Sequence, residues 1–196
     1  MEIAIIKYNA GNVRSVENAL KRLGITPKLS DNPEIIAKAD RVLFPGQGEA
    51  NNAMRYLKEH KLDDTIKTLK QPVLGICIGQ QLLCKHTEEG DTDGLGIFDV
   101  EVKRFRPKLH EDKVPAMGWN SLHGISSDIF KGVENGEYVY FVHSYYVPLC
   151  ESTIATTNHI TPYSAALQKG NFYATQFHPE KSGAVGEKIL KNFLEL

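Results

Sequence analysis

The first half of the chain alternates short apolar segments with amphipathic ones. Four segments are typical of buried strands: 3–6, 25–29, 41–44 and 72–77. Helical spacing of apolar residues predicts helices between them, at 13–23, 33–39, 50–69 and from residue 78 onward. Asn12 stands where an N-cap is expected, and Gly24 where a C-cap is expected. This alternation predicts a parallel sheet with helices on both faces.

The second half has a different pattern. Strand-like runs follow one another with few helices between them, at 95–98, 100–105, 119–122, 138–142, 153–157, 164–168 and 172–177. A last helix is predicted from Gly183, with Val185, Ile189, Leu190 and Phe193 facing inward. The expected fold is α/β and flavodoxin-like: a mostly parallel sheet, with additional antiparallel strands in the second half. No linker divides residues 1–196, so we expect one domain.

Composition narrows the classes of function. A net charge of −1 argues against nucleic acid or an anionic membrane as the main partner. The basic stretch 103–108 is expected to be a solvated strand end and loop. Three cysteines without a C-x-x-C pair favour a reducing, cytoplasmic location and argue against disulfides or a zinc site. Cys84 is predicted to be a core residue of the helix after residue 77. No signal peptide or membrane span is predicted, and we expect neither a metal nor a cofactor.

Cys77 is the first candidate for chemistry. It stands between Gly75 and Gly79, where an apolar strand meets a helical pattern, which is the layout of a nucleophile elbow. Such a turn strains the backbone of the central residue, and glycines on either side avoid collisions. A sulfur at a helix N-terminus favours thiolate, the nucleophilic form. The alternative is a small buried hydrophobe, which is the ordinary role of a lone cysteine.

His178 and Glu180 are the second candidate. Pro179 should hold the chain extended, so that both side chains point the same way, and a carboxylate can orient an imidazole base. The loop after the third strand, Gly46-Gln47-Gly48, has glycines that expose backbone amides. Together with the Ile78 N–H, an amide of this loop is a candidate oxyanion site, whereas the alternative is an ordinary βα loop.

Taken together, these motifs resemble those of the class I glutamine amidotransferase family. The residues that carry the resemblance are Cys77 in Gly-Ile-Cys-Ile-Gly-Gln-Gln, the loop Pro45–Gly48 and Phe177-His178-Pro179-Glu180. Three narrower motifs, at 8–16, 117–120 and 141–145, are similar to the branch of the family that supplies ammonia to a cyclase of histidine biosynthesis. One departure is that Gln47 takes the place of the valine usual in the oxyanion loop.

The resemblance implies a glutaminase with a Cys77-His178-Glu180 triad that passes ammonia to a partner in a heterodimer. It implies that Gln81, Glu89, Ser144 and Tyr145 hold the L-glutamine substrate. The partner would be a cyclase subunit with a (β/α)₈ barrel, and Asn12, Trp119, Asn120 and Lys181 would lie near it. For Gln81 the alternative is a polar helix residue, and for Trp119 a half-buried core aromatic.

Three other functions stay open at this point. Another glutaminase of the class could serve pyridoxal phosphate or anthranilate synthesis, although the motif at 117–120 argues against both. A thiol hydrolase acting alone would need no partner. A non-catalytic flavodoxin-like binding module would leave Cys77, His178 and Glu180 unexplained together.

Overall fold

The computed structural model describes residues 1–8 and 11–196, so Asn9 and Ala10 of the predicted 8–12 loop lie outside the described residues. Within the described ranges, seven strands form the main sheet: β1 Ile3–Ile6, β2 Lys28–Ser30, β3 Arg41–Gly46, β4 Val73–Cys77, β11 Thr153–His159, β12 Thr161–Lys169 and β13 Phe172–Thr175. Their spatial order is β11-β12-β13-β4-β3-β1-β2. The strands from β13 to β2 run parallel, and β12 and β11 are antiparallel. The predicted mostly parallel sheet with later antiparallel strands is confirmed.

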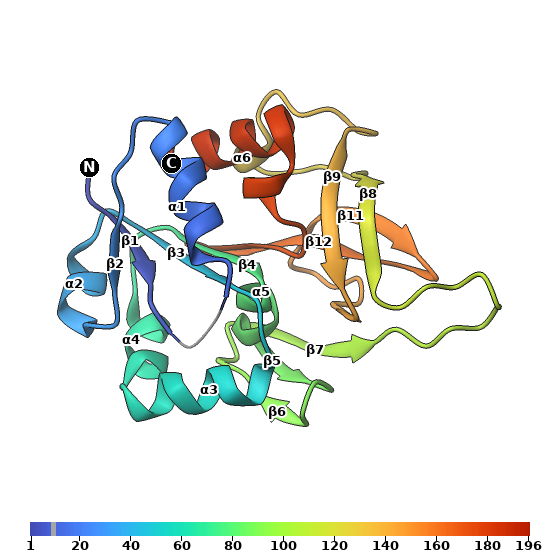
Figure 1. Cartoon of the computed structure of the whole chain (residues 1–196), viewed down its shortest axis with the longest axis horizontal. Helices are drawn as coiled ribbons and strands as arrows, with labels where there is room; N and C mark the ends of the chain where they lie inside the picture. The colour runs from blue at the N-terminus through green and yellow to red at the C-terminus, as the bar shows by residue number, and fades with distance from the viewer. Residues whose placement is uncertain (9–10) are drawn as a thin grey trace.

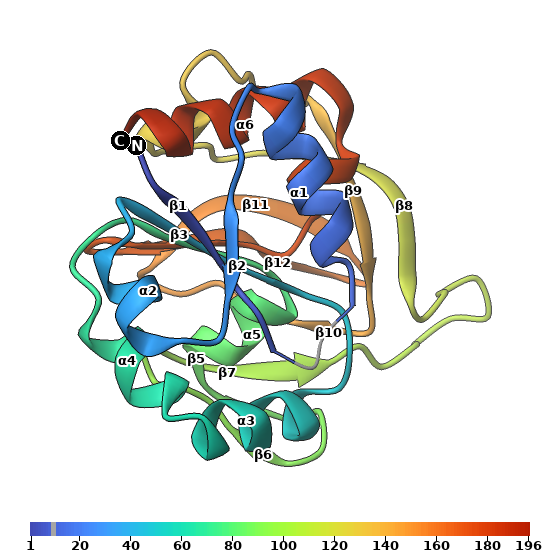
Figure 2. The ribbon, with the colours of Figure 1, turned by 60° about the vertical axis from the view of Figure 1, so that its left-hand side comes forward.

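Helices cover both faces of this sheet (Figures 1 and 2). One face carries α1 Val13–Arg22 and α6 Gly183–Glu195, and the other carries α2 Pro33–Lys38, α3 Ala50–Glu59, α4 Leu62–Thr68 and α5 Ile78–Leu83. Alternate residues of β1 separate the two cores: Ile3 and Ile5 pack toward α1 and α6, whereas Ala4 and Ile6 pack toward the other helices. No helix of the described chain is both long and apolar enough to cross a membrane.

The second half adds two small sheets beside the main one. The first is formed by β5 Cys84–Thr87, β6 Thr92–Asp93, β7 Phe98–Arg104 and β10 Tyr145–Tyr146. In the second, β8 Ala116–Ser121 pairs antiparallel with β9 Tyr138–His143. Two short 3₁₀ helices complete the chain, η1 Asp128–Phe130 and η2 Pro179–Lys181. Figure 1 shows β8 and β9 standing at the end of the main sheet away from β1 and β2.

Several local predictions are wrong. The second strand begins at Lys28 rather than at residue 25, because Pro27 precedes it and cannot donate to a ladder. The predicted helical stretch 50–69 is confirmed and consists of two helices, separated where Lys61 adopts a positive φ of 56°. No separate strand occupies 95–98, since Leu95 N–H donates instead to the Leu82 carbonyl.

The elbow region also differs from the prediction. Helix α5 ends at Leu83, so Cys84 begins β5 and is not on the helix, although its burial is confirmed. With only 6 residues, α5 has a short run of aligned peptide dipoles. The charge effect of a helix N-terminus grows with that alignment, so α5 contributes less to a thiolate at Cys77 than the sequence suggested.

Candidate active site

The turn at Cys77 has the geometry of a nucleophile elbow. Cys77 ends the buried strand β4 with φ 55° and ψ −108°, and Ile78 begins α5 directly afterward. A side chain at Gly75 would come within 2.7 Å of Leu83, and one at Gly79 would overlap the Phe44 carbonyl. A non-glycine residue held in such a backbone conformation costs on the order of 1–3 kcal/mol. The predicted sharp strand–turn–helix is therefore confirmed, and it fixes the position of the sulfur.

His178 and Glu180 form a buried pair. Nδ1 of His178 lies 2.8 Å from Oε1 of Glu180, and both side chains are fully buried. We predicted that an extended chain would bring them together, and this is wrong: the 3₁₀ helix η2 turns the backbone after His178. The Ser182 hydroxyl donates to the His178 carbonyl at 2.7 Å and holds this turn closed.

The charge state of His178 follows from its neighbours. Burial alone would lower the imidazole pKa, but the Cys77 sulfur and the Glu180 carboxylate outweigh it and raise the pKa to about 9. At neutral pH the ring is therefore an imidazolium that donates from Nδ1 to Glu180. Its Nε2 is buried and has no hydrogen-bond partner among the described residues, so this atom is free to exchange a proton with a bound molecule.

Asn12 contacts the candidate triad of Cys77, His178 and Glu180, which the sequence did not predict. Its Nδ2 donates to Glu180 Oε1 at 2.5 Å and lies 3.3 Å from His178 Nδ1. The side chain does not cap α1, because Asn12 adopts a left-handed conformation with φ 72° that turns it toward η2. Asn12 therefore stands at the expected N-cap position, but its side chain makes no capping hydrogen bond. Glu180 Oε1 accepts from two donors at once, which fixes the carboxylate.

The proposed oxyanion loop lies directly beside Cys77. Gly46 of β3 is in register with Cys77 of β4. The Gln47 N–H, however, donates to the Gly11 carbonyl at 3.2 Å, and the Gln47 carbonyl accepts from Gly11 N–H at 2.8 Å. This amide is therefore already bound to another group. Ile78 is the first residue of α5, so its N–H has no carbonyl of the preceding turn to bond and can serve a ligand.

Tyr8 supports this loop from one face of the sheet. A Cβ at Gly46 would overlap the Tyr8 hydroxyl and come within 2.5 Å of Ile78 Cγ2. The hydroxyl is buried and has no hydrogen-bond partner among the described residues. Burial, and then the nearby Cys77, raise the Tyr8 pKa well above its usual value, so the phenol stays neutral. Tyr8 is the first residue of the 8–16 motif, but the sequence alone indicates no role for it.

A pocket of about 260 Å³ opens onto Cys77 and is lined by every residue predicted to hold glutamine. Those lining residues include Gln81, Glu89, Ser144 and Tyr145, together with Gln47, Gly48, Ile78, Val142 and His143. Burial, and then the nearby Glu49, raise the Glu89 pKa to about 7. Near pH 7 Glu89 is therefore partly ionised. The ammonium group of a bound amino acid would favour its carboxylate form.

His143 shapes this pocket, and sequence analysis quoted it without a role. Its Nδ1 lies 2.6 Å from the Tyr145 carbonyl and its Nε2 lies 3.0 Å from the Tyr163 hydroxyl. Burial lowers the His143 pKa to about 4, so the ring is neutral near pH 7. A neutral ring that donates to the Tyr145 carbonyl fixes the backbone of Ser144 and Tyr145. In the sequence, the feature that could have indicated a role for His143 is its place in the 141–145 motif, next to the aromatic residues Phe141 and Tyr145.

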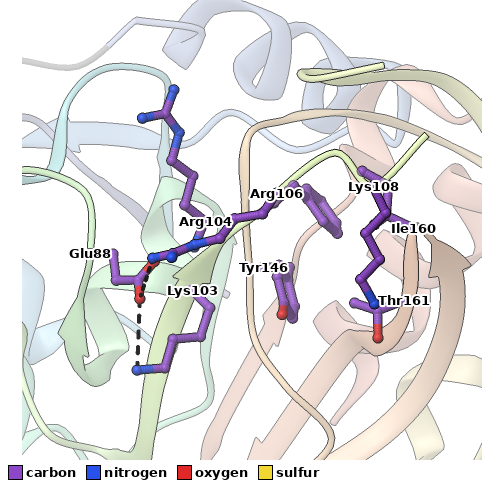
Figure 3. A pocket seen from close by; sticks show the side chains of 9 residues that line it. Glu88, Lys103, Arg104, Arg106, Lys108, Tyr146, Ile160 and Thr161 are labelled. Atoms are coloured by element: carbon purple, nitrogen blue, oxygen red, sulfur yellow. Dashed lines mark hydrogen bonds and ion pairs between the residues drawn. The ribbon is translucent and has the colours of Figure 1, made fainter. Parts of the chain in front are cut away.

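A second pocket, of about 310 Å³, contains none of the triad (Figure 3). It is lined mainly by the basic stretch 103–108 with Tyr146. Glu88 Oε1 lies 3.9 Å from Lys103 Nζ and 3.7 Å from Arg106, and these two ion pairs are drawn in Figure 3. The Arg106 side chain is 81% exposed. The prediction of a solvated strand end and loop is confirmed here. Among the described residues, no group of three or more His, Cys, Asp or Glu could hold a metal ion.

The predicted partner-facing residues lie on connected elements. Trp119 and Asn120 are on β8, and Trp119 is 56% exposed, so it is not a half-buried core aromatic. Its ring lies 6.0 Å from that of Tyr140 on β9, in an edge contact. Tyr140 in turn accepts at its carbonyl from His178 N–H. Lys181 ends η2, one residue after Glu180, so this face adjoins the triad.

The chain belongs to the class-I glutamine amidotransferase family, which matches residues 4–196. It is 61% identical over 196 residues to the imidazole glycerol phosphate synthase subunit HisH of Bacteroides fragilis, and the match spans the whole of both chains. The subunit of the same name in Escherichia coli is 46% identical over 200 residues, again across both full lengths.

Solved structures of this class share the fold. A glutamine amidotransferase from Thermotoga maritima superposes with a TM-score of 0.65 at 20% identity, covering 100% of this chain and 81% of that one. Another glutamine amidotransferase superposes with a TM-score of 0.75, also at 20% identity, covering 98% and 97%. At this level of identity the likeness concerns the fold alone.

Proposed function

We propose that this chain is the glutaminase subunit of imidazole glycerol phosphate synthase, which hydrolyses glutamine and delivers the ammonia to a cyclase. The observation that carries the proposal is the Cys77 elbow, which opens onto the 260 Å³ pocket beside the buried His178–Glu180 pair. The identity of 61% over the full length to a subunit of that synthase favours it over the pyridoxal phosphate and anthranilate branches.

The reaction follows from the positions of the groups. Cys77 thiolate attacks the side-chain amide carbon of glutamine, and the Ile78 N–H and an amide of the Gly46–Gly48 loop bind the oxyanion. His178 gives its proton to the departing ammonia, which leaves a thioester on Cys77. His178 then takes a proton from water as the water attacks, and glutamate is released. Glu180, held by Asn12, orients His178 through both half-reactions.

Activity is held back at rest by the oxyanion loop. With Gln47 N–H bound to Gly11, the Gly46–Gln47 peptide does not offer that donor to the substrate. Loss of one such donor typically costs on the order of 10²–10³ in rate. Docking of the partner can turn the peptide only if the partner binds the turned state more tightly. Because Gly11 and Asn12 are adjacent, movement of this segment would reach the oxyanion loop and the triad together.

The partner is a cyclase subunit with a (β/α)₈ barrel, and the two form a heterodimer. The relatives at 61% and 46% identity carry names that describe a subunit, which supports the existence of a partner. Exposed Met117 and Trp119 on β8, with Lys181 on η2, are the surface we assign to it. The reducing compartment expected from the three free cysteines is the cytoplasm. We also propose that residues 1–196 form one domain, because both cores pack on the same sheet.

The test separates ammonia production from its use. Cys77→Ala should abolish glutamine-dependent product formation by the complex with the cyclase, while added ammonium salt restores it. If ammonium fails to restore product, the two activities are not divided between the subunits as proposed. Selective labelling of Cys77 by a glutamine-mimicking electrophile should accompany this result, and equal labelling of Cys84 would contradict it.

A second test addresses the route of activation. Lys181→Ala removes the side chain that we assign to the partner but keeps the backbone N–H that donates to the His178 carbonyl at 3.0 Å. The variant should therefore lose part of the activation by the cyclase, while alkylation of Cys77 in the isolated chain stays unchanged. Unchanged activation would place the coupling elsewhere on the surface.

A further inference from the structure

Gln176 occupies the side of Cys77 opposite the oxyanion loop. Strands β13 and β4 are parallel neighbours with Thr175 in register with Ile76, so the next residues, Gln176 and Cys77, also lie side by side. The Gln176 carboxamide is fully buried, and its Nε2 lies 3.8 Å from the Cys77 sulfur. The sulfur is thus flanked by Gly46 on one strand and by Gln176 on the other.

The surroundings of Gln176 offer few hydrogen-bond partners for its amide. Its neighbours along the chain, Thr175 and Phe177, are fully buried. Its Oε1 has no hydrogen-bond partner among the described residues, and a buried acceptor left without a partner is unfavourable for folding. An apolar side chain of the same size would avoid that penalty. The sulfur is the group within reach that a buried amide N–H can serve.

The Val142 carbonyl near the sulfur favours the thiol and not the thiolate. The Val142 carbonyl lies 4.0 Å from Cys77 Sγ and can accept only from the thiol form. The six-residue helix α5 adds a short dipole. A thiolate in this buried position therefore needs donors from side chains, and an N–H that points at an anion makes a stronger hydrogen bond than one between neutral groups.

We propose that Gln176 is a positioning residue that holds Cys77 as the thiolate by donating its carboxamide N–H to the sulfur. His178 is the second group that favours the anion, because it interacts electrostatically with the same sulfur. Gln176 does not line the glutamine pocket, so its effect is on the nucleophile and not on substrate binding. The inference rests on the proposed role of Cys77 as the nucleophile.

Other ionisable groups share this environment and enter any pH profile. His178 and Tyr8 are electrostatically coupled to Cys77. Glu180 and His143 are coupled to His178. Because Gln176 itself does not titrate, replacing it changes the profile through the sulfur and adds no titration of its own.

The experiment measures alkylation of Cys77 by iodoacetamide across pH in the full-length chain. Iodoacetamide reaches the sulfur through the pocket that opens onto Cys77 and reacts with the thiolate, but it is not an amino acid, so the result does not depend on whether glutamine is the substrate. Gln176→Leu should move the pH midpoint of alkylation upward by about one unit, which is about a tenfold lower rate below the midpoint. The plateau rate at high pH should stay the same. In glutamine hydrolysis, kcat should fall and KM should not change.

Gln80→Leu is the matched control. Gln80 is also a fully buried carboxamide with an unpartnered Oε1, but its Nε2 lies 3.5 Å from the Ser164 carbonyl, and among the described residues it makes no hydrogen bond to Cys77. Its alkylation profile should match that of the unchanged chain. Gln176→Glu keeps the shape but replaces the donor with an anion, and should move the midpoint at least as far as Gln176→Leu. This second variant decides the matter if Gln176→Leu does not fold.

An unchanged midpoint in a folded Gln176→Leu or Gln176→Glu variant would overturn the proposal. A midpoint that moves downward would also overturn it, because the amide would then be accepting from the thiol. A fall in folded stability with an unchanged midpoint would reduce Gln176 to a packing role.

Discussion

The two loops that meet at the proposed site differ in readiness. The elbow after β4 is set: Cys77 is held at φ 55° by close contacts at Gly75 and Gly79, and the backbone has no room to relax. The loop after β3 is one strand away and in register, yet its Gln47 N–H is bound to Gly11. The nucleophile is therefore fixed by packing, whereas the oxyanion donor depends on a hydrogen bond that can be exchanged. We therefore propose that control of the reaction belongs to the second loop.

Removing the sulfur of Cys77 should have the largest effect, and it tests the elbow after β4, which is the fixed loop. Cys77→Ala and Cys77→Gly should each lower glutamine hydrolysis by at least about 10³-fold, because no other nucleophile stands at the elbow. Urea unfolding should nevertheless find Cys77→Gly more stable than Cys77→Ala by about 1 kcal/mol, since glycine adopts this backbone without strain. Equal stabilities would mean that the turn stores no strain.

Gly46→Ala should have the next largest effect, and it acts on the oxyanion loop after β3. The new methyl group would overlap the Tyr8 hydroxyl and press on Ile78, which displaces the loop. We expect a loss of about 10²–10³ in kcat for glutamine hydrolysis, the worth of one oxyanion donor. Adding Tyr8→Phe removes the overlapping oxygen and should restore part of the rate. A double variant as slow as the single one would show that Tyr8 does not set the loop.

Asn12→Ala should have a smaller effect, because it removes a positioning contact and leaves the triad in place. Glu180 Oε1 would lose one of its two donors, and a hydrogen bond to a charged group is worth enough for about a tenfold fall in kcat. Asn192→Ala is a matched control: its amide binds backbone carbonyls at Ile129 and Lys131, on η1 and just after it. If both variants lose activity equally, the effect of Asn12 is general and does not act through Glu180.

The smallest expected effect concerns substrate binding. With its pKa raised to about 7, Glu89 is mostly neutral below that pH and mostly anionic above it. The anion attracts the α-ammonium of glutamine, so KM should fall as pH rises through about 7. Glu89→Gln should remove this dependence while kcat changes little. A KM that keeps its pH dependence in the variant would assign the titration to another group.

The sequence predicted the parts of the molecule that rest on local pattern. The parallel strands are continuous apolar segments, and the elbow is marked by glycines at fixed spacing from Cys77. Pairing of His178 with Glu180 was also predicted. The extended backbone predicted there is wrong, because a proline at the first position is equally suited to a 3₁₀ turn. The family resemblance supplied Gln81, Glu89, Ser144 and Tyr145, which no spacing rule would have found.

The contacts that sequence analysis missed join segments distant in the chain. Asn12 meets Glu180 across 168 positions, and Gln176 meets Cys77 across 99. Each contact depends on strand order in the sheet, and strand order is set by the packing of the whole domain. Asn12 stands where an N-cap is expected because a helix follows it, but the left-handed backbone that redirects its side chain has no strong local signal.

The central claim is that the elbow is ready and the oxyanion loop is not. Its most direct test is glutamate release by this chain alone and in the complex with the proposed cyclase partner, with the cyclase's own substrate bound. We predict that the complex raises glutamate release by at least about tenfold, mostly in kcat, a modest part of the worth of one oxyanion donor. Iodoacetamide alkylation of Cys77 should stay nearly the same in both. Full turnover by the chain alone, equal to that of the complex, would contradict the claim.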